Sequence, residues 1–168
     1  DLDYLLENYV DPVEFIRNNR PIRNTACVLT PYDNKTLVWF WMPASVSEQT
    51  IDELATNIKR LAPNVSGIII KVVDGENWQG IFADGDMAIK GADDIRRWVT
   101  TLDVHGLELH IWAVPHGLNI TPETTLLATA ANVEGVKSLI LDVEPYTNYW
   151  QGGELSIVPF LCKLSRLF

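Results

Sequence analysis

The chain has 168 residues, of which 47% are hydrophobic and 21% are charged, so it can bury a core and lacks the bias of a disordered or fibrous protein. Its 22 acidic and 13 basic residues give a formal net charge of -9. Nucleic-acid binders normally present a basic surface, so this charge argues against a nucleic-acid partner. The apolar runs are far shorter than the ~20 residues that cross a bilayer, so we expect one soluble domain without a membrane span.

Two cysteines, Cys27 and Cys162, lie near opposite ends of the chain. Neither a CxxC motif nor a histidine pair accompanies them, so they do not indicate a zinc site. They either form a disulfide, which requires an oxidising compartment, or remain two buried thiols. The chain begins at Asp1 rather than Met, and we expect a processed protein or a fragment.

Residues 1–35 predict a lead-in segment that packs on the domain. They contain two helical pieces, DYLLENYV and PVEFIRNN, followed by a Pro- and Asn-rich stretch without a sustained period. The next residues, TLVWFWM at 36–42, are β-branched and aromatic and end at Pro43, which predicts a strand. We therefore place the regular domain at residues 36–168.

A helix and a second strand follow. SEQTIDELATNIKRLA has helically spaced apolar residues, a candidate N-cap at Ser47 and an end before Pro63. SGIIIKVVDG, residues 66–75, is an almost unbroken apolar run, typical of a strand buried on both faces of a parallel sheet. DDIRRWVTTLDVHG predicts the next helix, which ends at Gly106.

The same alternation continues to the end of the chain. LELHIWAVPHG predicts a third strand, and TPETTLLATAANVEG predicts its helix, with Thr121 as cap, Pro122 at the first position and an end at Gly135. VKSLILDVEPY predicts the fourth strand. GELSIVPFLCKLSRLF predicts the fourth helix, in which Pro159 is tolerated only near the first turn.

Four strand-then-helix units of about 30 residues each imply right-handed crossovers and a parallel sheet. Polar and aromatic residues gather where each strand ends, which is where (βα)8 barrels build their sites. A full barrel needs eight units and roughly 250 residues. The fold class we predict is therefore α/β, with parallel βα repeats forming the N-terminal half, four βα units, of a TIM-barrel-like fold.

Three explanations remain open for the other half of the barrel. It is missing, or a second half-barrel or larger assembly supplies it, or the four units form a small open sheet with an edge that something covers. The first strand is followed by neither GxGxxG nor GxxxxGK, so we expect no nucleotide cofactor, and nothing else in the chain indicates a different one.

The fourth strand carries two carboxylates. In LILDVEPY alternate side chains share a face, so Asp142 and Glu144 point the same way, with their Cα atoms about 6.5 Å apart. One charged acid of such a pair keeps the proton on its neighbour, which suits a general acid at neutral pH. Glu144, nearer the mouth, is the candidate proton donor, and Asp142 orients it. Alternatively, Asp142 pairs with a buried lysine such as Lys71 and Glu144 is a solvated residue at a strand end.

Other strand ends add candidates for substrate binding. KVVDGENWQG places Asp74 at the same mouth and Trp78 in the next loop, where a sugar ring can stack, although Asp before Gly is also ordinary turn chemistry. His116, at the end of the third strand, is a better functional candidate than His110, for which we expect a buried, hydrogen-bonded state. The two histidines have no third ligand at convincing spacing, so we expect no metal.

PYTNYWQGG, directly after the carboxylates, is rich in aromatic and amide side chains. Tyr146, Tyr149 and Trp150 can stack on the apolar faces of sugars, and Asn148 and Gln151 can form hydrogen bonds with hydroxyl groups. The alternative is that this loop packs beneath the following helix.

Three strand segments resemble a known family. IIIKVVDG, LHIWAVPHG and LILDVEPY resemble the signature segments of glycoside-hydrolase-type barrels, especially the lysozyme-like muramidases of glycoside hydrolase family 25 and related uncharacterised bacterial barrels. The resemblance covers residues 36–150 and implies that Glu144 is the general acid, that Asp142 assists and that Asp74 lies in the pocket. The family also has an Asp near the end of the first strand, where TLVWFWMPAS has no acid.

The function we expect is that of a glycoside-hydrolase-like domain acting on a polysaccharide, since two carboxylates are the minimum that such chemistry requires. The alternative is a non-catalytic glycan-binding module, or a structural subunit of an assembly, derived from such a barrel. In either case we expect a bacterial protein that is secreted or held at the cell surface.

Overall fold

The computed structural model describes residues 29–168, and Pro31–Phe168 form one unit that contains all the described helices and strands. The two helical pieces predicted near the start of the chain lie outside the described residues, as does Cys27. Cys162 is a free cysteine and is exposed, so the alternative of a buried thiol is wrong for this residue.

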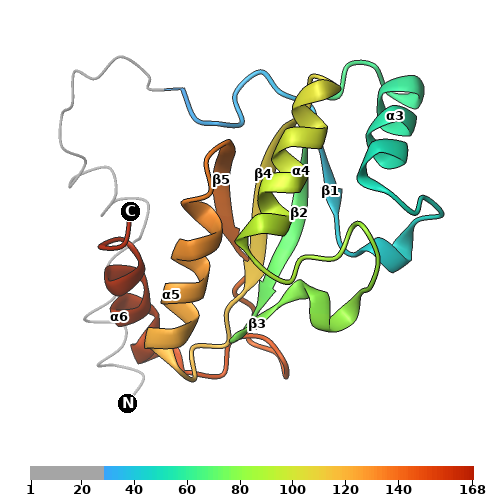
Figure 1. Cartoon of the computed structure of the whole chain (residues 1–168). Helices are drawn as coiled ribbons and strands as arrows, with labels where there is room; N and C mark the ends of the chain where they lie inside the picture. Colours follow the sequence, from blue (N-terminus) through green and yellow to red (C-terminus); the bar gives the residue numbers. More distant parts are fainter. Residues whose placement is uncertain (1–28) are drawn as a thin grey trace, which may run out of the picture. The chain divides into compact units, whose positions relative to one another are not determined.

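The unit is built on a parallel sheet. Its strands β1 (Leu37–Phe40), β2 (Gly67–Asp74), β4 (Glu108–Val114) and β5 (Val136–Leu141) lie in the order β1-β2-β4-β5, and all neighbours are parallel (Figure 1). The two-residue strand β3 (Asn77–Trp78) folds back antiparallel to the end of β2. The order across the sheet follows the order along the chain, so right-handed crossovers bring all connecting helices to one face.

Four helices alternate with these strands, namely α3 (Ile51–Leu61), α4 (Ala92–Val104), α5 (Ile120–Ala131) and α6 (Glu154–Leu164). Figure 1 shows α4 and α5 in front of the strands, with α3 and α6 to either side. Short 3-10 turns, η1 (Pro43–Ser45) and η2 (Gln79–Phe82), lie in the loops after β1 and β3. Within residues 29–168 no helix combines the length and apolarity needed to cross a bilayer. The parallel sheet and its alternating helices confirm the predicted fold class.

The two faces of the sheet are packed differently. Alternate strand residues such as Phe40, Ile70 and Ile111 pack with the helices in the main core. On the other face a smaller cluster forms around Trp112, and no described helix covers it. In a closed barrel this second face lines the interior. A parallel sheet with helices on one face and a second apolar cluster on the other is the arrangement of a partial barrel.

Both edges of the sheet are unpaired within the described part of the chain, and an apolar groove lies beside each. The groove beside β1 and α3 has a volume of about 410 Å³, and the groove between β5 and the helices α5 and α6 has about 350 Å³. Trp39 and Trp41, which line the first groove, are 50% and 55% exposed. In a closed barrel of eight βα units both edges would be paired with further strands, so unpaired apolar edges are expected when only four units are present.

The start of α3 differs from the prediction. Its N-cap is Thr50, whose hydroxyl accepts a hydrogen bond from the Glu53 amide at 3.1 Å, so the prediction of Ser47 was wrong. The sequence did contain the signal, because Thr50 and Glu53 have the spacing of a capping box and Ser47 has no acid three residues later.

The ends of the later helices also differ. The N-cap of α5 is Asn119 rather than Thr121, since Ile120 is already helical, and the helix ends at Ala131 rather than at Gly135, because Asn132 already caps it. Pro159 is the sixth residue of α6 rather than part of its first turn. The carbonyl that loses its helical partner belongs to Leu155, which is fully exposed to solvent, so water can take the place of the missing amide.

Candidate functional site

A small cavity lies where the parallel strands end. It has a volume of about 190 Å³ and is lined from β2, β4, η2 and the loops after β1 and β5, through Trp41, Met42, Lys71, Asp74, Phe82, Val114, Asn148 and Tyr149. The carboxyl ends of parallel strands meet at one edge of a sheet, so residues far apart in sequence come together there. The cavity therefore lies at the end of the sheet where the sequence predicted a site.

Asp74 connects two basic side chains at this cavity. Its Oδ2 accepts a hydrogen bond from Nζ of Lys71 at 2.6 Å, and its Oδ1 lies 2.9 Å from Nε2 of His116, in a contact that is not aligned as a hydrogen bond. Lys71 is buried, and its charge requires a partner there. That partner is Asp74 and not Asp142. Asp74 thus does more than terminate a turn.

Two aromatic rings complete the surroundings of Lys71. Its Nζ lies 5.3 Å from the ring centroid of Trp112 and 5.6 Å from that of Phe82, both within the range of a cation–π interaction. One carboxylate and two rings therefore fix this ammonium group on the face of the sheet that lies opposite the helices. The ring of Trp112 is fixed in turn, because its Nε1 donates a hydrogen bond to the carbonyl of Phe40 at 3.1 Å.

Asp142 and Glu144 follow the end of β5. The Asp142 amide donates to the Ala113 carbonyl at 2.8 Å, which extends the sheet ladder, and the Glu144 carbonyl accepts a hydrogen bond from the Trp150 amide at 3.0 Å. Both side chains are half-buried. Among residues 29–168 neither carboxylate forms a hydrogen bond or an ion pair. Their backbones are held by the fold, and their carboxylates are available to a ligand.

Three carboxylates converge on Tyr149. Burial raises the pKa of the Tyr149 hydroxyl, and the negative charges of Glu144, Asp142 and Asp74 raise it further. Tyr149 lines the cavity and packs against the smaller apolar cluster around Trp112, on the face of the sheet opposite the helices. The structure therefore brings together three acids and one tyrosine that the sequence proposed from two different strand ends.

His116 is held in place by a buried carboxylate that the sequence reasoning missed. Glu123 of α5 is 1% exposed, and its Oε2 accepts hydrogen bonds from the amides of His116 and Gly117 at 2.8 and 2.9 Å. Its Oε1 accepts from the amides of Leu118 and Asn119, both at 3.0 Å. Four consecutive amides pointing at one anion form a nest. The available signal was an acid in the first turn of a predicted helix, where amides are free.

The other predicted aromatic residues separate into packed and open ones. Trp78 packs against the main core, and Trp150 lies edge-on to Phe160 at a centroid distance of 5.2 Å. Trp150 also donates a hydrogen bond from Nε1 to the Gly153 carbonyl at 2.9 Å. Tyr146 is 65% exposed and does not line the cavity. For Trp150 the structure therefore has the alternative arrangement, in which the loop packs beneath α6.

The end of the first strand contributes side chains that the sequence reasoning did not propose. Trp41 and Met42 line the cavity where the family has an acid, and Phe82 enters from η2. No regular spacing relates Phe82 to a strand end, so pattern reasoning had no means of finding it. Asn148, proposed as a hydrogen-bonding residue, does line the cavity.

A second polar cluster includes His110, near the beginning of β4. His110 is fully buried, its Nδ1 lies 2.8 Å from Oγ of Ser138, and its Nε2 lies 3.5 Å from Oε2 of Glu108. Lys35 forms an ion pair with Glu108. The predicted buried, hydrogen-bonded state of His110 is thus confirmed. Burial lowers the pKa of His110, although the nearby charge of Glu108 acts in the opposite direction.

We expect His110 to make the unit less stable as the pH falls below about 6.5. Because its pKa is lowered in the folded state from an ordinary value of 6.5, the unfolded chain binds a proton first, and the free energy of unfolding decreases through this window. Urea unfolding between about pH 7.5 and 5 measures this slope. His110→Gln should flatten it. An unchanged slope in His110→Gln would show that other groups cause it.

Comparison with known proteins found no match, whether among protein families, curated proteins or solved structures.

Proposed function

We propose that this unit is a glycoside-hydrolase-like domain that acts on a polysaccharide at the carboxyl ends of its strands. The observation that carries the proposal is that Asp74, at the end of β2, and Asp142 and Glu144, just after β5, lie at the same end of the sheet as a cavity lined by Asp74 and Tyr149. Glycoside hydrolysis requires two carboxyl groups that flank the scissile bond. Asp142 and Glu144 make no competing contacts among the described residues.

In the proposed reaction Glu144 donates a proton to the glycosidic oxygen as the bond to the anomeric carbon breaks. A water molecule forms the new bond to that carbon, and the proton that the water loses passes to a carboxylate. The negative charge of Asp142 stabilises the positive charge that develops on the sugar ring, and orients Glu144. Asp74, which is paired with Lys71 and His116, holds the sugar through its hydroxyl groups. Tyr149 offers an aromatic face to the sugar ring, and Asn148 offers a hydrogen-bonding amide.

These roles agree with the resemblance to family 25 muramidases. The first strand is nevertheless followed by Trp41 and Met42 and has no acid at its end. We therefore propose hydrolysis of a glycan and do not propose muramidase specificity. A cell-wall polysaccharide as substrate would agree with the expected bacterial origin and with a location outside the cell or at its surface.

The test is the release of reducing ends from peptidoglycan and from chitin-type polymers by the whole chain. Release is expected for the unchanged chain, lost in Glu144→Gln and retained in Glu134→Gln, which alters an exposed residue between α5 and β5. If no polymer yields reducing ends, the hydrolase proposal is wrong.

One observation favours the alternative, a non-catalytic glycan-binding or structural subunit. Both sheet edges are unpaired in residues 29–168 and carry apolar grooves, so a second half-barrel or a larger assembly would bury them and wall the cavity. Sedimentation of the chain tests this assembly, and a stable monomer without a partner would contradict it. Saturable glycan binding without turnover, unchanged in Glu144→Gln, would favour the glycan-binding module.

A further inference from the structure

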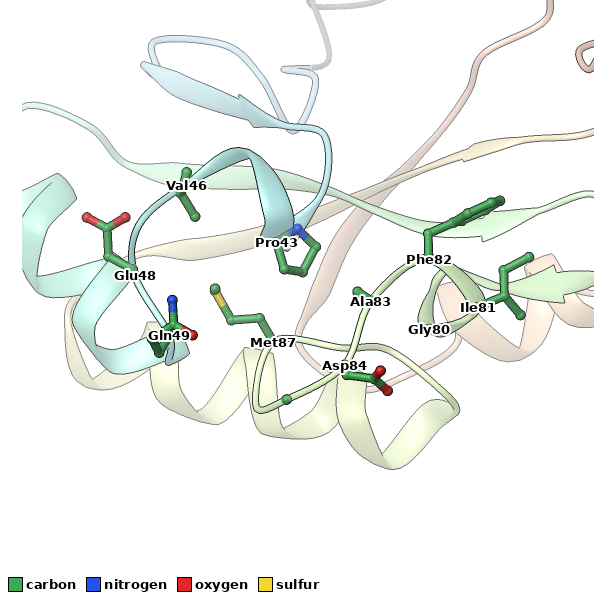
Figure 2. A pocket seen from close by; sticks show the side chains of 11 residues that line it. Pro43, Val46, Glu48, Gln49, Gly80, Ile81, Phe82, Ala83, Asp84 and Met87 are labelled. Atoms are coloured by element: carbon green, nitrogen blue, oxygen red, sulfur yellow. The ribbon is translucent and has the colours of Figure 1, made fainter.

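A groove larger than the candidate cavity lies beside it. Its volume is about 530 Å³, and two loops far apart in sequence form its walls. The loop between β1 and α3 supplies Pro43, Val46, Glu48 and Gln49, and the loop between β3 and α4 supplies Gly80, Ile81, Phe82, Ala83, Asp84, Gly85 and Met87. Figure 2 shows Met87 between Gln49 and Pro43, with Phe82 and Ile81 on the far side of the groove.

The groove and the cavity adjoin along two walls. Phe82 lines both, is 48% exposed, and has its ring 5.6 Å from Nζ of Lys71 in the cavity. On the other wall Met42 lines the cavity and the next residue, Pro43, lines the groove. A ligand held between the strand ends can therefore continue past Phe82 without leaving the protein surface.

The volumes of the cavity and the groove together suit a ligand longer than one sugar. The cavity, at about 190 Å³, is smaller than the ~300–1,000 Å³ of ordinary ligand pockets, whereas the groove, at about 530 Å³, lies inside that range. A single ring that filled the cavity would leave the groove empty. A linear chain of several sugars would occupy both.

The lining also selects the charge of the ligand. The ionisable residues of the groove, Glu48 and Asp84, are both acidic. A hydrogen bond from Asn57 lowers the pKa of Glu48, so this carboxylate is charged at neutral pH, while Lys90 pairs with Asp84 at 3.0 Å. None of the residues that line the groove is basic, and the one lysine of the cavity, Lys71, is already paired with Asp74, so an anionic polymer would find no free positive charge along the groove or the cavity. The exposed ring of Phe82 suits the apolar face of a sugar.

We propose that the site takes a linear glycan of several uncharged or amine-bearing sugars, which runs from the cavity over Phe82 into the groove walled by Ile81, Met87 and Gln49. This inference rests on the proposed function and adds the length and charge of the substrate to it.

The experiment measures how affinity depends on glycan length. Isothermal titration of the whole Glu144→Gln chain, chosen so that the ligand is not cleaved, compares a dimer and a hexamer of N-acetylglucosamine. We expect the hexamer to bind at least about tenfold more tightly than the dimer. Phe82→Ala should abolish most of this gain. Ile81→Ala, which alters only the groove, should weaken the hexamer and leave the dimer unchanged.

Controls separate this inference from the proposed function. Phe168→Ala removes an exposed ring away from the groove and should preserve the gain with length. An oligogalacturonate of six units should bind more weakly than the neutral hexamer, and tighter binding would overturn the charge argument. Equal affinity for the dimer and the hexamer would contradict the proposal that the groove binds glycan. The hydrolase proposal would still stand if the chain released reducing ends. If neither oligomer binds, the groove proposal is wrong, whatever the outcome of the hydrolysis assay.

Discussion

Replacing Glu123 with alanine is expected to lower the free energy of unfolding by about 3 kcal/mol or more. The buried carboxylate accepts hydrogen bonds from four consecutive amides, at residues 116–119. A hydrogen bond to a charged group contributes about 1.5–3 kcal/mol, and the four contributions are not additive because they share one anion. Without the carboxylate these amides lose their common partner, and the amide of Gly117 loses it in a buried position. Urea unfolding, with the denaturant slope checked for constancy, measures the loss.

Two further variants separate charge from shape. Glu123→Gln keeps the volume but turns an NH2 group toward amides that also donate, so its loss should approach that of the alanine variant. Glu134→Ala, at an exposed site, should change the stability by less than about 0.5 kcal/mol. A Glu123→Ala protein as stable as Glu134→Ala would mean that water replaces the carboxylate at no cost. Because the same loop carries His116, the variant should also weaken glycan binding.

The fold was predictable because its signals are local and repeat. The apolar run of β2 and the end of α4 just before Gly106, which has a positive φ, follow from side-chain and backbone chemistry within a few residues. The order of the units then determines the topology, since each crossover has the same hand. The errors concern helix boundaries, as at Ser47, where several hydroxyl residues compete for one cap, and at Gly135, before which Asn132 already ends α5.

The site was predictable only where a strand end positions it. Asp74, Asp142 and Glu144 lie at the ends of β2 and β5, and the parallel sheet brings them together. Glu123 lies in the first turn of a predicted helix, which indicates a partner among free amides, but the four amides converge on it only after the loop turns through Gly117, at a φ of 68°. A tryptophan in an aromatic loop looks the same in the sequence whether it stacks on a sugar or packs on a neighbouring ring. The packing of Trp150 on Phe160 could therefore not be distinguished from sugar binding in advance.

Replacing Glu144 with glutamine is expected to lower kcat on a polysaccharide by about 10²- to 10⁴-fold, the usual contribution of a general acid. Glutamine keeps the size and the polar contacts of the side chain but cannot deliver the proton to the leaving oxygen. The backbone bond from the Trp150 amide to the Glu144 carbonyl is retained, so the free energy of unfolding should change by less than about 0.5 kcal/mol. Steady-state kinetics of Glu144→Gln and of Glu134→Gln provide the comparison.

The choice of substrate identifies which role Glu144 has. An aryl glycoside with an acidic phenol as leaving group needs no proton, so Glu144→Gln should lose far less activity on it than on the polysaccharide. Asp142→Asn should lose activity on both, because the charge on the sugar ring develops whatever the leaving group is. Equal losses on both substrates in Glu144→Gln would assign the charge-stabilising role to Glu144 instead. The pattern of the two variants on the two substrates therefore decides which carboxylate carries the proton.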